Sequence, residues 1–389
     1  MVTPRGVGSG HPRSEECGVL FMRIELSSPD ISDAEKQAVL DVLSSGRLSL
    51  GPKVAEFEHA VANYVGTRHA VAVSSGTCGL HLLIRAIGIQ PGDEVVTTPF
   101  SFVASSNCVL FERGRPVFVD IEPDTWNIDP TAMAAAITPK TRALLPVDAF
   151  GQVAKIDEVN ALARKHGLRV IEDSCEALGS TYKGRKAGSL ADAGVFGFYP
   201  NKQITTGEGG MITTNDDQIA NLCRSMRNQG RDTMAWLAHD RLGYNYRLPD
   251  INCAIGVVQM QRIDEILGKR ERVAGWYKQR LGDDRRIVWQ RVIPECTLSW
   301  FVFVVKLSDD YSEQRRNEII QKLRDVGIGC SNYFAPIHLQ KFYREELGYK
   351  QGQFPVCERV AARTIALPFH CHLTEGQVDE VCTTLRKLL

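Results

Sequence analysis

A single lysine stands between an apolar strand pattern and a glycine-rich loop. Residues 194–213 read GVFGFYPNKQITTGEGGMIT, so Lys202 lies on a connection between two strand patterns. A lysine fixed there beside small residues can approach a planar ligand and react through its amine. The same pattern also fits a surface lysine in a hairpin loop, because lysines are mostly exposed.

Two acidic residues end the strand pattern that precedes this stretch. In GLRVIEDS, Val170 and Ile171 form a short β-branched strand that ends at Glu172 and Asp173. Open α/β sheets bind ligands at the carboxyl ends of their strands. A lysine and an aspartate at two such ends fit a pyridoxal phosphate (PLP) site, where the lysine forms a Schiff base and the aspartate pairs with the pyridine nitrogen. Asp173 taken alone reads as a turn or capping residue.

Two further motifs provide contacts for such a cofactor. A strand pattern over residues 70–73 leads through Ser-Ser-Gly-Thr into a buried helix. Backbone N–H groups and the helix dipole converge there, so we expect Gly76 and Thr77 to hold a phosphate, with an ordinary helix cap as the alternative. The next strand pattern is followed by Phe100 and Phe102. We expect Phe102 to stack on the pyridine, and core packing is the rival role for either ring.

The composition argues against several classes of protein. Lys plus Arg and Asp plus Glu both number 46, so the net charge gives no sign of nucleic-acid or membrane-surface binding. The 11 cysteines contain no CxxC pair, which predicts reduced thiols and a cytoplasmic protein. No apolar run is long enough to span a bilayer. We expect no metal site, since neighbouring residues in His370-Cys371-His372 point to opposite faces of a strand.

The order of the patterns predicts an α/β fold. Strands and helices alternate through the first half of the chain, which favours a mostly parallel central sheet flanked by helices. The chain of 389 residues exceeds the size at which one core stops growing. We therefore expect a disordered extension over residues 1–21, a large domain over 22–260 and a smaller C-terminal α+β domain over 261–389. Met22 is a candidate for the true start.

The second half of the chain has fewer motifs. A helix from Asp250 toward Lys269 is expected to link the domains. Beyond it we expect a strand over residues 300–307, a proline-broken loop over 333–343 and a last helix over 374–388.

Together these motifs resemble the DegT/StrS family of PLP-dependent nucleotide-sugar aminotransferases, which have the aspartate-aminotransferase (type I) fold. The likeness covers nearly everything from Met22 to the end. It rests on SSGT, PFSFVAS, GQ, IEDSCEALG, FYPNKQITTGEGG, GYNYRL and PIHLQ, in that order. The resemblance implies that Lys202 carries PLP, that Asp173 binds the pyridine nitrogen and that Glu176 lies near the ring hydroxyl.

The resemblance also implies a homodimer with a shared active site. In the family an asparagine of the neighbouring subunit reaches the cofactor phosphate, and Asn245 in GYNYRL matches it. Arg247 beside it, together with Tyr333 and His338 in the proline-broken loop, are the expected substrate-binding residues.

Three residues depart from the family pattern. Gly197 stands where serine often binds the phosphate, so that hydrogen bond is missing or comes from another donor. Glu176 replaces a common glutamine. A carboxylate would repel a phenolate oxygen, so we expect it to be protonated or turned aside. Asp148 stands where histidine is frequent, which leaves the sugar-side contacts open.

The resemblance implies transfer of the amino group of L-glutamate to a nucleotide-linked keto sugar. Members that dehydrate the sugar have histidine in place of Lys202. The loop TTGEGG resembles enzymes that aminate C4 of 4-keto-6-deoxy sugars, whereas C3 enzymes more often read LGALGD. The alternatives are C3 amination and a DegT-like regulatory or sensory protein without turnover.

Overall fold

A seven-stranded sheet with the order β1-β9-β8-β5-β4-β2-β3 forms the centre of the molecule. The computed structural model describes residues 23–232 and 239–389, so the expected extension over 1–21 and Met22 lie outside the described residues. Strand β9 pairs antiparallel with β1 and β8, and the other neighbours are parallel. The predicted mostly parallel sheet is confirmed. The strands are β1 (His69–Val73), β9 (Gly210–Thr214), β8 (Ala193–Gly197), β5 (Arg169–Asp173), β4 (Thr141–Leu145), β2 (Glu94–Thr97) and β3 (Arg115–Phe118).

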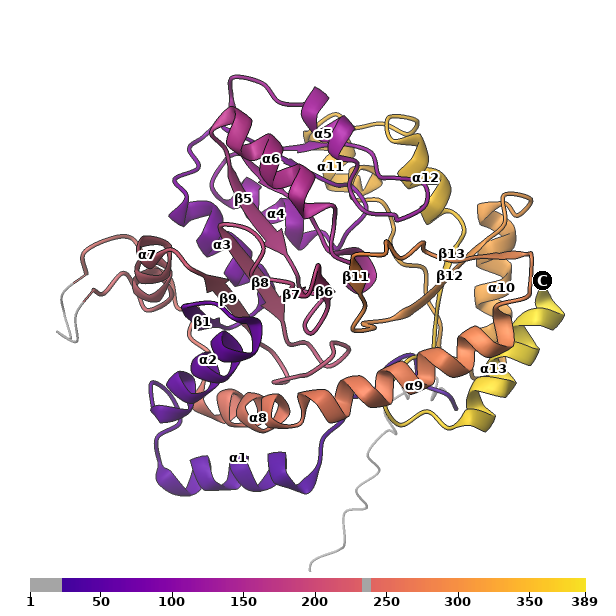
Figure 1. Ribbon diagram of the computed structural model, residues 1–389, viewed down its shortest axis with the longest axis horizontal. Coiled ribbons are helices and arrows are strands. Elements are labelled where there is room, and N and C mark those ends of the chain that lie inside the picture. The colour runs from indigo at the N-terminus through magenta and orange to yellow at the C-terminus, as the bar shows by residue number, and fades with distance from the viewer. Residues whose placement is uncertain (1–22, 233–238) are drawn as a thin grey trace, which may run out of the picture.

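Helices cover both faces of this sheet, because successive strand residues point to opposite sides. Val71 and Val73 pack with α3, α4 and α7 on one face. Ala70 and Ala72 pack with α2 and α8 on the other, which α5 and α6 also cover. Figure 1 shows α1 and α8 lying along one end of the molecule. The helices are α1 (Asp33–Ser45), α2 (Pro52–Val65), α3 (Gly76–Ala86), α4 (Ala104–Phe111), α5 (Pro130–Ala135), α6 (Ile156–His166), α7 (Asp217–Arg227) and α8 (Asp250–Gln261).

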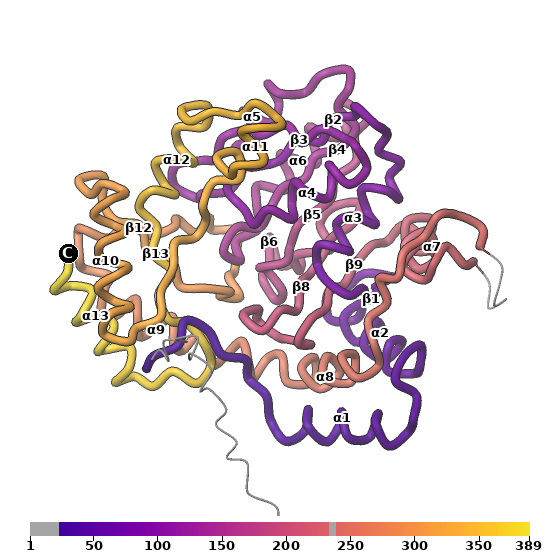
Figure 2. Tube along the Cα trace, turned by 180° about the vertical axis from the view of Figure 1, so that it is seen from behind, coloured from indigo at the N-terminus to yellow at the C-terminus, as the bar shows by residue number. Residues whose placement is uncertain are grey.

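The seven-stranded sheet and its helices form the first of two bodies. A smaller sheet of order β10-β12-β13 belongs to the second body and lies beside the first (Figure 2). Its core contains the stacked rings of Tyr277 and Phe303, with centroids 4.6 Å apart. Ile24 belongs to this core and pairs with Ile328, although the expected division assigns it to the large domain. The division into domains stays a prediction. The elements are α9 (Ile263–Leu281), β10 (Ile287–Val288), β12 (Phe303–Leu307), α10 (Glu313–Asp325), α11 (Lys341–Glu346), α12 (Pro355–Ala361), β13 (Thr364–Leu367) and α13 (Glu375–Leu388).

A third sheet and two short helices connect the bodies. Its order is β11-β6-β7, so a strand from the second half of the chain pairs with a hairpin that follows β5. These elements are β6 (Thr181–Tyr182), β7 (Arg185–Lys186), β11 (Cys296–Thr297), η1 (Ala149–Gly151) and η2 (Ile337–Leu339). Within residues 23–232 and 239–389, no helix combines the length and the apolar character needed to cross a membrane.

Three expected elements of the second half differ from the structure. The helix expected from Asp250 breaks at Arg262 into α8 and α9. The strand expected from Trp300 begins at Phe303, because Trp300 has a φ of 37°, outside the extended region. The loop expected from Tyr333 contains η2 and α11.

Arg262, at the break between α8 and α9, is the centre of an ion-pair cluster. Its Nη2 lies 2.9 Å from Asp30 Oδ1 and its Nη1 lies 2.7 Å from Glu35 Oε1. Lys269 Nζ lies 2.7 Å from Asp30 Oδ2. Glu35 is only 1% exposed and belongs to the capping box with Ser32 that begins α1. The cluster therefore ties α1 to the junction of the two bodies.

Burial alone would raise the pKa of Glu35, but hydrogen bonds from Ser32 and then Gln259 outweigh it and lower the pKa to about 2. The pKa of the folded state is thus below that of the unfolded chain. This contribution to stability is present above about pH 4.5 and is lost as the pH falls toward about 2.

We expect Glu35→Ala to lower the free energy of unfolding at neutral pH by about 3 kcal/mol, because Arg262 loses a buried partner. Glu265→Ala removes an exposed partner of the same arginine and should cost less than about 1 kcal/mol. Denaturant-induced unfolding measures both variants. Equal losses would show that burial does not set the strength of this cluster.

Candidate active site

The connection between β8 and β9 holds Lys202 on a closed turn. Phe198 N–H donates to the carbonyl of Gly209 over 2.9 Å. The carbonyl of Phe198 accepts from Thr205 Oγ1 at 2.9 Å and from Thr206 N–H at 3.1 Å. These bonds join the two ends of the connection, so the lysine backbone is fixed relative to the sheet.

Three groups surround Lys202. Its Nζ lies 3.7 Å from Glu176 Oε1 and 3.9 Å from the ring centroid of Phe301. Arg270 Nη2 donates to the Lys202 carbonyl over 2.7 Å. The carboxylate and the aromatic face both stabilise a positive charge on the amine. The side chain is 15% exposed and therefore remains accessible to a ligand.

Asp173 ends β5 and is 4% exposed. Its Oδ2 accepts a hydrogen bond from Ser105 Oγ at 2.7 Å, and its Oδ1 accepts from Cys175 N–H at 3.2 Å. Each carboxylate oxygen thus accepts one hydrogen bond from the protein. The remaining lone pairs of the carboxylate can accept a hydrogen bond from a ligand.

Lys202 and Asp173 line the same cavity, which has a volume of about 1210 Å³. The amine and the carboxylate that the sequence singles out therefore face one space. The other predicted residues that line it are Gly76, Thr77, Phe102, Glu176 and Tyr333.

The amino end of α3 forms one end of this cavity. Ser75 caps the helix by accepting from Cys78 N–H at 3.1 Å, and the first-turn N–H groups have no partner within the helix. A Cβ at Gly76 would lie 2.8 Å from Cys175 Sγ and 3.4 Å from the Cα of Gly197. A side chain here would crowd Cys175 and Gly197, and glycine leaves the N–H groups of the helix end open to an anion such as the PLP phosphate.

Aromatic residues also line this cavity. Phe301 and Tyr333 stack with centroids 6.3 Å apart and an interplanar angle of 13°. Phe102 lines the cavity and is 65% exposed, so its ring is free to cover a ligand. Phe100 is fully buried, and core packing is the role that its position supports. The sequence contains no local signal for Phe301, because it lies far from Lys202 in the chain.

Asn201 offers an independent indication of a ligand. Its Oδ1 is buried and lacks a hydrogen-bond partner within the described chain, and the residue lines the cavity beside Lys202. Buried acceptors are normally paired, so an unpaired one at a cavity wall marks a place for a donor. The residues present therefore fit PLP: an amine, an acid for the ring nitrogen and an anion pocket at one end.

Asn245 and Arg247 do not line the cavity of their own chain. Asn245 is exposed and forms an isolated bridge with Asn228, whose side chain accepts from Arg247 Nη1 at 3.0 Å. Their expected place in the site of a neighbouring subunit stays a prediction.

His338 does not lie where a substrate residue is expected. Its side chain is fully buried, and Nε2 lies 2.9 Å from Glu358 Oε1. The ring packs edge-on against Phe354, with centroids 4.7 Å apart. Burial lowers the pKa of His338, so the neutral imidazole is favoured. Its neighbour Ile337 faces the cavity instead, because η2 turns the two side chains in different directions.

Glu176 is not turned aside. Its Oε2 accepts from Phe150 N–H at 2.9 Å while Oε1 faces Lys202. Burial, opposed by Lys202, raises the pKa of Glu176 to about 6. Asp148 is fully buried and accepts from Ser174 Oγ at 2.7 Å, so it does not reach the cavity.

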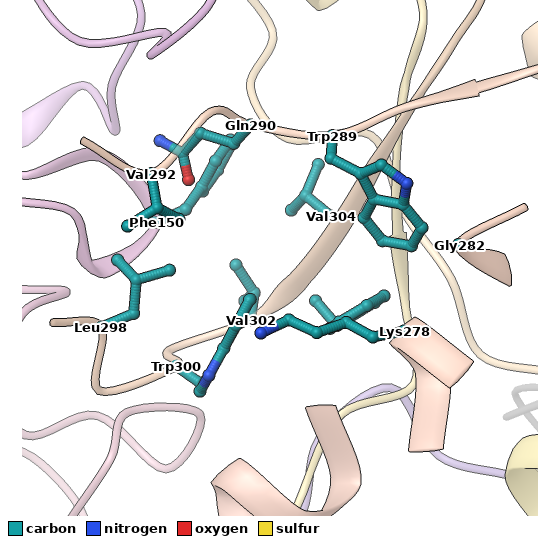
Figure 3. A pocket seen from close by; sticks show the side chains of 11 residues that line it. Phe150, Lys278, Gly282, Trp289, Gln290, Val292, Leu298, Trp300, Val302 and Val304 are labelled. Carbon is teal, nitrogen blue, oxygen red and sulfur yellow. The ribbon is translucent and has the colours of Figure 1, made fainter. Parts of the chain in front are cut away.

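A second, smaller cavity of about 220 Å³ lies nearby (Figure 3). Figure 3 shows Trp289, Trp300 and Val304 on its walls and Lys278 at its edge. Lys278 Nζ lies 4.5 Å from the Trp300 ring centroid. No acidic residue or histidine lines this cavity, so it lacks the pair of groups found in the larger one. In the described part of the chain no group of histidine, cysteine and acidic residues could hold a metal ion.

The comparison with known proteins agrees with this geometry. The model of the DegT/DnrJ/EryC1/StrS aminotransferase family matches residues 29–386. The chain belongs to this family. It is 39% identical over 369 residues to the GDP-perosamine synthase of Caulobacter vibrioides, covering 94% of this chain and 98% of that protein. It is 37% identical over 374 residues to the spore coat polysaccharide biosynthesis protein SpsC of Bacillus subtilis, covering 93% and 96%.

A solved structure supports the fold and the cofactor of this aminotransferase. The PLP form of the sugar aminotransferase Spr1654 from Streptococcus pneumoniae, described as putative, superposes with a TM-score of 0.89 at 29% identity. The match covers 94% of this chain and 99% of that one. The predicted family, type I fold and PLP dependence are confirmed, and the protein is a PLP-dependent sugar aminotransferase.

The pKa of Glu176 gives a prediction for the cofactor-free enzyme. Because the folded pKa of about 6 lies above the unfolded value of 4.5, its contribution to stability is present below about pH 4.5 and is lost as the pH rises through about 6. Between about pH 5 and pH 7.5 the free energy of unfolding of the wild type should fall by about 1 kcal/mol more than that of Glu176→Gln.

Denaturant-induced unfolding at both pH values measures this difference. The control is Glu208→Gln, which removes an exposed carboxylate at the same cavity and should unfold with the pH dependence of the wild type. A Glu176→Gln variant with the wild-type pH dependence would rule out a raised pKa at this residue.

Proposed function

We propose that the enzyme transfers the amino group of L-glutamate to C4 of a nucleotide-linked 4-keto-6-deoxy sugar. The observation that carries the proposal is that Lys202 and Asp173 line one cavity with an anion pocket at the end of α3. The cavity volume of about 1210 Å³ leaves room for a large substrate beside the cofactor. The likeness to a GDP-perosamine synthase supports a nucleotide sugar as that substrate.

The choice of C4 rests on the loop that follows Lys202. TTGEGG resembles the C4 enzymes of the family, and its Glu208 and Gly209 line the cavity. This position supports a contact between the loop and the substrate. C3 amination is the alternative. Locating the new amine in the product distinguishes it from C4 amination.

The chain's own residues divide the chemistry between them. PLP, when bound, supplies an electron sink for the carbon that gains or loses the amino group. Lys202 Nζ would hold the cofactor, and as a free amine it would carry a proton to or from the reacting carbon. Asp173 holds the proton of the ring nitrogen at its free lone pair. Phe301 and Phe102 line the cavity, where their rings can pack against a bound pyridine ring.

Glu176 and Arg270 orient the lysine. The carboxylate of Glu176 lies 3.7 Å from Nζ, and Arg270 fixes the lysine carbonyl at 2.7 Å. Glu176, whose pKa is raised to about 6 by burial, therefore faces the lysine amine across an ion-pair distance.

We also propose a homodimer with a shared active site. Asn245 and Arg247 lie outside the cavity of their own chain, and Asn245 is exposed. The cavity rim carries exposed apolar side chains, namely Phe102, Phe111, Tyr199 and Phe342. Such a patch favours contact with another protein surface. The weaker alternative is a regulator without turnover. It would give no function to Lys202 and Asp173, which line the same cavity.

We expect Lys202→Ala to abolish turnover, since no other amine lines the cavity in the described chain. Borohydride treatment should attach PLP covalently to the wild type and not to the variant. Lys278→Ala, at the separate small cavity, should behave as the wild type in both measurements. Full activity of Lys202→Ala would exclude the assigned role.

A panel of nucleotide-linked keto sugars with L-glutamate tests the substrate. We expect a new amine at C4 of a 4-keto-6-deoxy sugar, located by NMR, and bleaching of the yellow enzyme when glutamate is added. An amine at C3 would move the assignment to the alternative. Colourless protein that PLP cannot reconstitute would favour the regulator.

A further inference from the structure

Ser105 lies in the first turn of α4 and touches the acid of the active site. It is fully buried, and its Oγ lies 2.7 Å from Asp173 Oδ2. Ser101, also buried, places its Oγ 2.7 Å from Ser105 Oγ. Both serines come from the PFSFVAS segment. Of this segment, the sequence predicts only Phe102 as a contact of the cofactor.

The chemistry of the groups sets the direction of these bonds. A carboxylate only accepts, so the single proton of the Ser105 hydroxyl is donated to Asp173. The carbonyl of Phe102 lies 3.2 Å from the same hydroxyl, a longer contact to a neutral acceptor. Because Ser105 has given its proton away, Ser101 must donate to Ser105. The result is a buried chain from Ser101 through Ser105 to Asp173.

The second oxygen of Asp173 is held separately. Cys175 N–H donates to Oδ1 at 3.2 Å. The backbone of Asp173 is also clamped, since its N–H donates to the carbonyl of Pro146 at 3.0 Å and its carbonyl accepts from Asp148 N–H at 3.0 Å. The carboxylate plane therefore has one partner on each oxygen and a fixed attachment to the sheet.

We propose that Ser105, supported by Ser101, is a positioning residue that fixes the Asp173 carboxylate for the pyridine nitrogen of PLP. A charge-assisted bond in a buried site is stronger than a neutral one and resists rotation of the carboxylate. It also stabilises the negative charge that the protonated ring nitrogen needs opposite it. The inference rests on the cofactor and not on the identity of the sugar.

The neighbouring residue Ser106 is a serine whose hydrogen bonds serve packing and do not reach Asp173. Ser106 is equally buried on the same helix, but its Oγ lies 2.7 Å from the hydroxyl of Tyr343 and 3.1 Å from the carbonyl of Val103. It has no contact with Asp173. Ser106→Ala is therefore a matched control for Ser105→Ala.

The test compares cofactor binding and turnover. Apo-enzyme titrated with PLP alone should show about tenfold weaker binding for Ser105→Ala, the loss of one hydrogen bond to a charged group. With saturating substrates kcat should fall by about tenfold while the KM values stay within about twofold. Ser106→Ala should match the wild type in PLP affinity and kcat to within about twofold. Ser105→Thr, which keeps the hydroxyl, should recover most of the loss.

PLP affinity separates this inference from the proposed sugar substrate, because it is measured without any sugar. Equal PLP affinity and kcat for Ser105→Ala and Ser106→Ala would overturn the inference. If Ser105→Ala does not fold, Ser101→Ala serves instead, since it removes the donor to Ser105 and leaves Asp173 untouched. It should weaken PLP binding by about threefold. Unchanged binding for that variant would likewise overturn the inference.

Discussion

The close approach of three backbone segments around Gly210 is the constraint on which the site depends. Gly210 opens β9 and pairs with Val73 at the end of β1 and with Gly197 at the end of β8. A Cβ on Gly210 would lie 2.5 Å from the carbonyl carbon of Ser75. The antiparallel strand β9 therefore brings the amino end of α3 against the turn that carries Lys202, and this contact makes one cavity from two separate sequence motifs.

The sequence was informative where a property is local. The strand and helix patterns predicted the parallel sheet, and the lysine and acid at strand ends predicted a PLP site. Ser105, Phe301 and Arg270 were missed, because each meets the site through packing between distant segments. His338 shows the opposite failure. A histidine in a family motif looked like a substrate contact, but η2 directs it into a hydrogen bond with Glu358.

The buried acidic residues near the cofactor site have different hydrogen-bond partners. Glu172 accepts N–H groups of Gly188 and Leu190, whereas Asp173 has a serine hydroxyl and a backbone N–H. Burial, together with repulsion from Glu172, raises the pKa of Asp148. The acidic residues behind the strand ends thus need not all be charged.

Arg270 links the two bodies of the enzyme at the catalytic lysine. This side chain of α9 is 2% exposed, and it donates to the carbonyls of Lys202 and Phe301. Burial lowers the pKa of Arg270, and its hydrogen bonds to Lys202, Trp300 and Phe301 all go to backbone oxygens. A motion that separated α9 from the central sheet would remove these backbone acceptors from the buried guanidinium of Arg270. The bodies are therefore mechanically coupled at the reactive amine.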